Sequence, residues 1–143
     1  MTSLPITTAT DNTGTDDTTK KLIPGHVIHC SSVEEYHAAL QAAGDGLVVV
    51  DVYADWCPPC QAMAPIFERL AAEYPQTVFI KVDVDRAPSL KHELSVWALP
   101  TFVFLKHGKK VGSFMGANQS LLKRGLENNG EVSICSNLAC IVQ

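Results

Sequence analysis

One run of seven residues, Leu47–Tyr53 with the sequence LVVVDVY, constrains the fold more than any other part of the chain. An almost continuous series of β-branched residues is typical of a strand buried on both faces of a sheet. Strands of this kind occur mainly in α/β proteins, where helices cover the sheet on both sides. The single charged residue of the run, Asp51, then lies where a carboxylate without a partner is costly.

The segments around this strand alternate between helix and strand patterns. Apolar residues at steps of three and four predict a helix from about Pro59 to Tyr74. Ser31 and Glu34 form a capping-box pattern that predicts the start of an earlier helix, and Asp85 is expected to cap a later, short one. The predicted strands span 26–30, 47–53, 77–82, 101–106 and 110–116, and the predicted helices span 31–43, 59–74, 85–94 and about 121–126.

This order predicts a mixed sheet with helices on both faces. The last two strands must be antiparallel, because the turn His107-Gly108-Lys109 is too short for a crossover. Residues 1–24 contain eight Thr within the first 20 positions and few large apolar side chains, so we expect a disordered extension. The predicted domain is residues 25–128, and residues 129–143 form a C-terminal tail.

Charge and composition exclude several classes of protein. The chain has 143 residues, with 11 basic and 15 acidic side chains, and its net charge of −4 argues against a nucleic-acid partner. No apolar window approaches the roughly 18 residues of a membrane span, so no membrane partner is expected. The N-terminal segment lacks the pattern of a secretory signal. A cytoplasmic location is therefore expected, with leaderless secretion left open, and a monomer is the simplest state.

Five cysteines in a reducing compartment point to chemistry or packing rather than to a disulfide framework. Cys57 and Cys60, in the sequence WCPPC, lie between the buried strand and the following helix. A thiol at a helix N-terminus meets unpaired N–H groups that favour the thiolate, and the second sulfur lies one turn further on. The pattern predicts dithiol–disulfide exchange at an exposed thiolate.

Two structural alternatives stay open at this point. A Cys-x-x-Cys pair can be half of a zinc site, or two packed thiols. A structural zinc needs four ligands, and the only other close cysteines are Cys135 and Cys140 in the tail, with no suitably spaced histidines. No metal is therefore expected, and these two tail cysteines are expected to be unpaired.

The residues around the pair resemble the active-site block of the thioredoxin family. The similarity runs through VVVDVYADWCPPCQAMAPIFERLAAEYP, FIKVDVD and ALPTFVFLKHGKKVGSFMGAN and covers about residues 26–128. The KHGKKVG hairpin and the GAN that follows the last strand are most similar to the eukaryotic cytosolic branch. The resemblance implies a thioredoxin fold, with a central mixed five-stranded sheet flanked by four helices, and protein-disulfide reductase activity in cell redox homeostasis.

The resemblance also implies roles for individual residues. Cys57 is the attacking thiolate and Cys60 the buried resolving thiol. Asp51 accepts the proton of Cys60 through water, and Lys81 is a nearby charge that modulates this step. Substrate docking is expected on a rim that includes the family's cis-proline turn and is formed by Trp56, Pro58, Pro59, Ala98, Leu99, Pro100, Gly116 and Ala117. Trp97, next to this turn, fits either the rim or the core.

One residue departs from the family pattern. Pro58 stands where the family has glycine, and it stiffens the dipeptide and removes a backbone donor. This leaves the redox potential open, and with it two alternatives to a reductase. One is an oxidase or isomerase of secretory proteins. The other is a redox-gated binding module that clamps a partner through Trp56 and the loop at Leu99 and Pro100.

The family resemblance finally implies how such a protein is supplied with electrons. No bound cofactor is expected. Electrons come from NADPH through a flavoprotein thioredoxin reductase, which is one expected partner. Oxidised protein substrates such as peroxiredoxins are the others.

Overall fold

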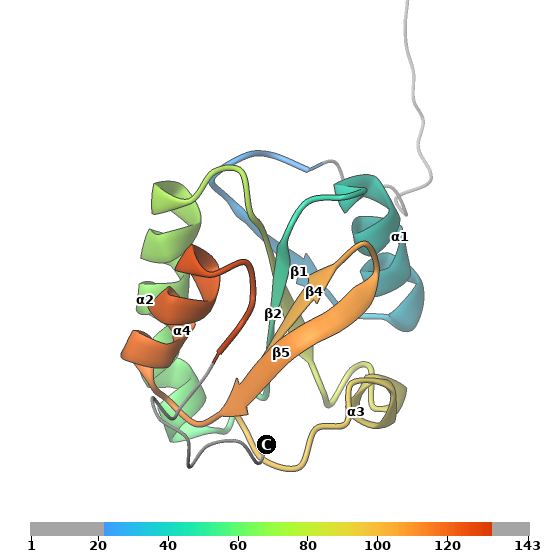
Figure 1. Ribbon diagram of the computed structural model, residues 1–143. Coiled ribbons are helices and arrows are strands. Elements are labelled where there is room, and N and C mark those ends of the chain that lie inside the picture. The colour runs from blue at the N-terminus through green and yellow to red at the C-terminus, as the bar shows by residue number, and fades with distance from the viewer. Residues whose placement is uncertain (1–21, 133–143) are drawn as a thin grey trace, which may run out of the picture.

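The computed structural model describes residues 22–132, and these fold into five strands and four helices in the predicted order (Figure 1). Residues 1–21 of the predicted extension lie outside the described residues, as do Cys135 and Cys140 of the predicted tail. The elements are β1 (Val27–Cys30), α1 (Val33–Ala43), β2 (Val48–Tyr53), α2 (Pro58–Glu73), β3 (Val78–Asp83), α3 (Ser89–Glu93), β4 (Thr101–Lys106), β5 (Lys109–Met115) and α4 (Gln119–Glu127).

The five strands form one mixed sheet in the order β1-β3-β2-β4-β5. β2 pairs in parallel with β3 and antiparallel with β4, so the LVVVDVY run supplies the central strand. Every residue of β2 from Val48 to Val52 is buried. The expectation of a strand covered on both faces, within a mixed five-stranded sheet, is confirmed.

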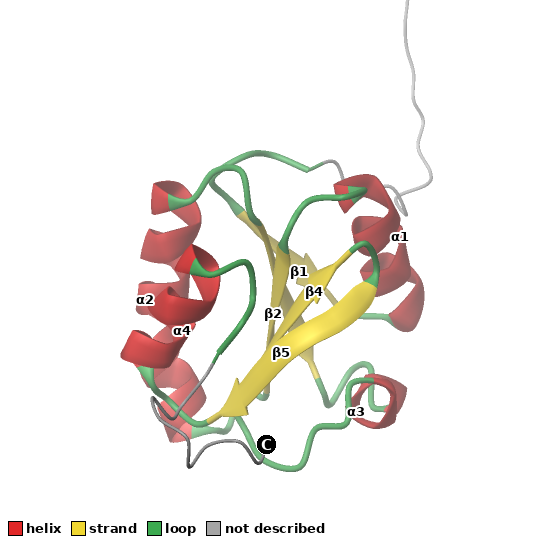
Figure 2. Ribbon diagram, in the orientation of Figure 1, coloured by secondary structure: helices red, strands yellow, loops and turns green. Residues whose placement is uncertain are grey.

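The helices lie in two layers on opposite faces of the sheet (Figures 1 and 2). α1 and α3 cover one face, where Tyr36 and Leu90 are fully buried. α2 and α4 cover the other, where Phe67, Phe102 and Leu122 belong to a second core. Because side chains alternate along a strand, Asp51 shares the face of α2 with Val49, which belongs to that second core.

The predicted starts of α1 and α3 are wrong in detail. α1 begins one residue late: Ser32 is its N-cap and accepts a hydrogen bond from the amide of Glu35 at 3.1 Å. The doublets Ser31-Ser32 and Glu34-Glu35 offer two capping registers, and the observed one buries Tyr36.

The second correction concerns α3. This helix begins at Ser89 after Pro88, without a side-chain cap, so Asp85 does not cap it. The N-cap directly precedes the first helical residue, and Asp85 lies three residues before Pro88, so it is too early in the chain to cap this helix. The carboxylate of Asp85 binds elsewhere, as described below.

The β4–β5 hairpin is antiparallel as predicted, with a turn one residue shorter than expected. Lys106 pairs with Lys109, so only His107 and Gly108 form the turn. Both have positive φ, 54° and 76°, which is the combination that a two-residue hairpin turn requires.

The packed body reaches slightly beyond residues 25–128. Leu22 packs against one core and Val132 against the other. Within residues 22–132, no helix has both the length and the apolar character needed to cross a bilayer.

Candidate active site

The two cysteines lie where β2 gives way to α2. Cys57 is the N-cap of α2, and Cys57 and Cys60 form a disulfide with their Cα atoms 5.2 Å apart. The amide of Cys60 donates a hydrogen bond to Sγ of Cys57 at 3.2 Å. Pro58 and Pro59, the first two residues of the helix, have no N–H group. Cys60 therefore supplies the first amide of the helix, and that amide is directed at the sulfur of Cys57.

This junction corrects the sequence analysis in two respects. The helix starts at Pro58 rather than at Pro59. Cys57 is also less accessible than expected: only 4% of the residue is exposed, against 2% of Cys60. Its sulfur is bonded to that of Cys60, and both residues are buried.

Access to Cys57 is through a surface pocket of about 550 Å³, which we call the disulfide pocket. The second cysteine does not line it. The lining comes from the WCPP segment, from the loop after β3 and from the loop before β4, and consists of Trp56, Cys57, Pro58, Pro59, Val84, Asp85, Pro88, Lys91, Trp97, Ala98 and Leu99. An incoming sulfur can therefore approach Cys57 but not Cys60.

Trp56 forms an exposed edge of this pocket. It is 65% exposed, and its indole Nε1 donates a hydrogen bond to Oδ2 of Asp85 at 2.8 Å. Gln61 donates to the carbonyl oxygen of Asp55 at 2.7 Å and so fastens the preceding loop to α2. The hydrogen bond between Asp85 and Trp56 could not be predicted from the sequence, because 29 residues separate the two and no pattern links them.

The loop before β4 contains the expected turn. The peptide bond between Leu99 and Pro100 is cis. The hydroxyl of Thr101 donates to the carbonyl oxygen of Ala98 at 2.6 Å, which fixes the loop from its far side. The amides of Ala98 and Leu99 form no hydrogen bond with any of residues 22–132, so they remain available to an extended chain.

The remaining members of the predicted rim occupy different positions. Gly116 is tied to the proline turn, since its amide donates to the carbonyl oxygen of Pro100 at 2.8 Å. Ala117 is exposed next to it. Neither residue lines the disulfide pocket, so any contact they make lies beyond it. Trp97, which the sequence left undecided, is 82% exposed and belongs to the pocket wall rather than to the core.

Asp51 is fully buried in the middle of β2, on the face covered by α2. Neither of its carboxylate oxygens has a hydrogen-bond partner among residues 22–132. Burial raises the pKa of Asp51 from 3.8 to about 7, against a smaller opposing effect from the positive charge of Lys81. At neutral pH this carboxyl group can therefore both hold and release a proton.

Lys81 is the neighbour of Asp51 on β3, in register across the parallel pair. Its ammonium group nevertheless lies over the ring of Tyr53, with Nζ 4.2 Å from the ring centroid. Tyr53 is two residues from Asp51 on the same strand and thus projects on the same face. The cation–π contact holds the ammonium group at the ring, and Asp51 has no hydrogen bond from it.

The zinc alternative finds no support in the described part of the chain. Between residues 22 and 132, no three His, Cys, Asp or Glu side chains are grouped in a way that could hold a metal ion. The two sulfurs that would have begun such a site are bonded to each other. The arrangement is that of a redox-active dithiol with access to one of its two sulfurs.

Comparison with known proteins agrees with this arrangement. The sequence model of the family described as Thioredoxin matches residues 27–128, which include the whole sheet and all four helices of the described chain. The chain belongs to the thioredoxin family. Among its thioredoxin relatives, one from Ictalurus punctatus is 44% identical over 105 residues, covering 72% of this chain and 98% of that protein.

Solved thioredoxin structures share the fold. Thioredoxin f from spinach chloroplast, in its long form, has a TM-score of 0.72 and 36% identity, covering 75% of this chain and 88% of that one. Thioredoxin f2 in a complex with ferredoxin:thioredoxin reductase has a TM-score of 0.70 and 32% identity, covering 75% and 97%. This thioredoxin-family chain is a protein-disulfide oxidoreductase, and its chemistry takes place on cysteine sulfur without a bound cofactor.

The burial of Asp51 predicts a pH-dependent stability. Because folding raises its pKa, the folded state binds the proton more tightly, and stability falls as pH rises from about 4 to about 7. Asp51→Asn removes the buried charge. In denaturant unfolding of the oxidised protein we expect little change at pH 4 and a gain of at most roughly 4 kcal/mol at pH 8. Glu131→Gln, at an exposed position, is the control. An equal effect of Asp51→Asn at both pH values would contradict the assignment.

The position of Lys81 predicts a role for the ring of Tyr53. In Tyr53→Leu the ammonium group loses its aromatic partner and can approach Asp51, so the pKa of Asp51 should fall below its value in the unsubstituted protein. Tyr53→Phe keeps the ring and should leave the titration unchanged. Carboxyl ¹³C NMR titration of the oxidised protein measures both. A pKa that is the same in all three proteins would show that the ring does not hold Lys81 away from Asp51.

Proposed function

We propose that this protein reduces disulfides in oxidised proteins, as a thioredoxin of the eukaryotic cytosolic type with the active site Trp56-Cys57-Pro58-Pro59-Cys60. One observation supports this above all. Cys57 lines an open pocket while its partner Cys60, bonded to it, does not. One sulfur can therefore meet the substrate, and the other can only complete the reaction from inside.

In the first step the thiolate of Cys57 attacks one sulfur of the substrate disulfide. A bond forms between Cys57 and that sulfur, the substrate disulfide breaks, and the other substrate sulfur leaves as a thiolate that takes up a proton. The Cys60 amide, 3.2 Å from Sγ of Cys57, stabilises the attacking thiolate. Trp56, Pro58 and Pro59 provide the apolar surface beside it.

In the second step Cys60 resolves the mixed disulfide. Its thiol gives its proton to the carboxylate of Asp51, and the resulting thiolate attacks Sγ of Cys57. The bond between Cys57 and Cys60 forms, and the second substrate sulfur leaves and is protonated. Two electrons have then passed from the dithiol to the substrate. A pKa of about 7 suits Asp51 to this exchange, and Lys81 adjusts it.

The substrate is held as an extended segment by the loop before β4. The amides of Ala98 and Leu99 can pair with its backbone in the manner of an added strand. Pro100 turns the loop beside the disulfide pocket, and Gly116 and Ala117 extend the contact surface beyond it. These roles complete the substrate-binding rim that the sequence implied.

Pro58 favours the reducing direction over the oxidase alternative. An oxidising dithiol protein depends on strong stabilisation of its reduced, thiolate form. Here Pro58 and Pro59 remove two of the first amides of α2, which leaves the Cys60 amide as the donor seen at Sγ of Cys57. A thiolate with fewer donors is less stabilised. The dithiol of Cys57 and Cys60 is then oxidised to its disulfide more readily, and the substrate disulfide is reduced more readily.

The electron supply is part of the same proposal. A reductase must return the disulfide of Cys57 and Cys60 to the dithiol after each turnover. We assign this to an NADPH-dependent flavoprotein thioredoxin reductase in the cytoplasm, and peroxiredoxins are candidate substrates. One structural neighbour, thioredoxin f2, is seen in a complex with a different reductase, which supports a reductase as a partner class.

Reduction of insulin disulfides with dithiothreitol as the electron source tests this function. The unsubstituted protein should accelerate precipitation of the insulin chains, and Cys57→Ser should lower the rate to that of dithiothreitol alone, because no sulfur remains at the pocket. Cys60→Ser should accumulate a mixed disulfide between Cys57 and its target, visible by non-reducing electrophoresis. A Cys135→Ser, Cys140→Ser double variant is the control and should keep full activity. Activity in Cys57→Ser would refute the mechanism.

A further inference from the structure

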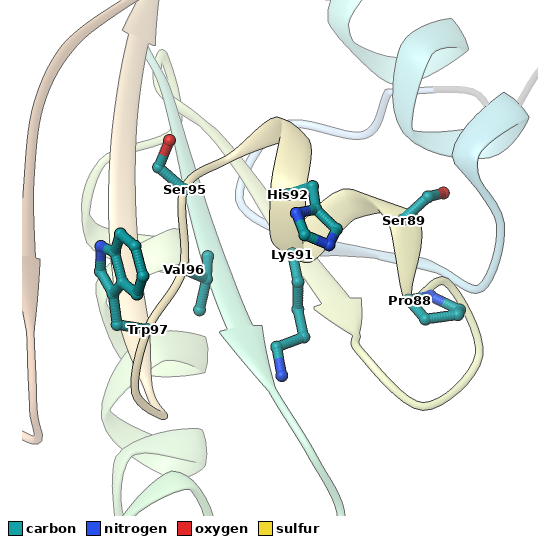
Figure 3. Close-up of a pocket in the computed structure, with 7 residues that line it drawn as sticks. All are labelled: Pro88, Ser89, Lys91, His92, Ser95, Val96 and Trp97. Atoms are coloured by element: carbon teal, nitrogen blue, oxygen red, sulfur yellow. The ribbon is translucent and has the colours of Figure 1, made fainter.

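A second and larger pocket, of about 800 Å³, lies beside the disulfide pocket (Figure 3). We call it the α3 pocket, because α3 and the loop that follows this helix form most of its wall. The two pockets share three residues: Pro88, Lys91 and Trp97. The two pockets therefore adjoin one another along these side chains, and a segment of substrate that leaves the disulfide pocket passes beside the α3 pocket.

The lining of the α3 pocket contains basic residues and no acidic one. It includes the side chains of Lys91 and His92 and the hydroxyl groups of Ser89 and Ser95, but no carboxylate. In Figure 3, Lys91 and His92 lie between Trp97 and Pro88. Lys91 has no ion pair with any of residues 22–132. A substrate carboxylate could therefore pair with Lys91 without displacing a carboxylate of this protein.

The nearby acidic side chains are already engaged elsewhere. Glu93, the next residue on α3, accepts from Nε2 of His37 on α1 at 2.7 Å and does not line the pocket. Asp85, on the side of the disulfide pocket, accepts from the indole of Trp56. Neither one lines the α3 pocket. The positive charge at the α3 pocket is therefore that of Lys91, while the carboxylate of Asp85 lies on the side of the disulfide pocket.

Trp97 completes the wall that the two pockets share. It is 82% exposed, although a side chain of this size is ordinarily buried at least in part. Trp97 stands directly before Ala98 and Leu99, whose amides are available to an extended segment. Its ring can pack against the methylene groups of an acidic side chain while Lys91 meets the carboxylate.

We propose that this protein prefers disulfides flanked by an aspartate or glutamate, and that Lys91 binds this carboxylate in the α3 pocket while Trp97 packs against its side chain. The inference rests on the proposed function, since it assigns a substrate class to the same site. Lys91 and Trp97 are specificity-determining residues in this assignment. They select the substrate and take no part in sulfur exchange.

Paired synthetic peptides test the preference. Each peptide contains one disulfide and a single glutamate, placed in turn at each of four positions on either side of a cysteine, and its partner has glutamine at the same position. The oxidation of the reduced full-length protein is followed by stopped-flow tryptophan fluorescence. For at least one position, we expect the glutamate peptide to react roughly twofold to fivefold faster than its partner at low salt, and the advantage to shrink in high salt.

Two variants assign the effect to the α3 pocket. Lys91→Gln should abolish the advantage of glutamate, so that the rate of each glutamate peptide divided by that of its glutamine partner falls to about one. Lys123→Gln makes the same charge change at an exposed position on α4, on the opposite face of the sheet, and should keep the advantage. Trp97→Ala should slow the reaction of the preferred glutamate peptide.

The outcomes separate this inference from the proposed function. If no peptide of either kind is reduced, the proposed function itself is wrong. If both kinds are reduced at equal rates at every position, or if Lys91→Gln keeps the glutamate advantage, the function stands and the α3 pocket does not select acidic substrates.

Discussion

The hydrogen bond from the amide of Cys60 to the sulfur of Cys57 is the interaction on which the rest of the site depends. It exists because a buried strand ends and a helix begins within a few residues, and because two prolines leave Cys60 as the first donor of that helix. The same geometry places one sulfur at a pocket and the other beneath it. The end of β2, the start of α2 and the disulfide pocket therefore meet at Cys57.

A second constraint is the burial of the carboxyl group of Asp51 in the central strand. The central strand that orders the sheet also places Asp51 where no hydrogen-bond donor of residues 22–132 reaches its carboxylate oxygens. A fold that served stability alone would have an apolar residue there, because burial of a carboxylate is costly. The cation–π contact holds the ammonium group of Lys81 at the ring of Tyr53, so this group forms no hydrogen bond with Asp51. The site thus retains a carboxyl group whose proton is exchangeable near neutral pH.

The sequence was sufficient for the parts of this description that depend on local patterns. The LVVVDVY run, the alternation of elements and the Cys-x-x-Cys spacing predicted the sheet, its helices and the pair of sulfurs. Contacts between segments that lie far apart in the sequence could not be predicted from local patterns. The Trp56–Asp85 hydrogen bond spans two loops, and the place of Lys81 depends on strand register and on Tyr53. The pocket at Cys57 is formed by three segments that lie apart in the sequence, and a local motif does not reveal them.

The central claim is that the position of Cys57 at the start of α2 makes it the reactive sulfur. The most direct measurement is the pH dependence of iodoacetamide alkylation of the fully reduced protein, with the modified residue identified by mass spectrometry. The account predicts that Cys57 is alkylated first, with an apparent pKa below the value of about 8.5 of an ordinary cysteine, while Cys60 reacts slowly. Alkylation of Cys60 before Cys57, or an unshifted pKa at Cys57, would contradict it.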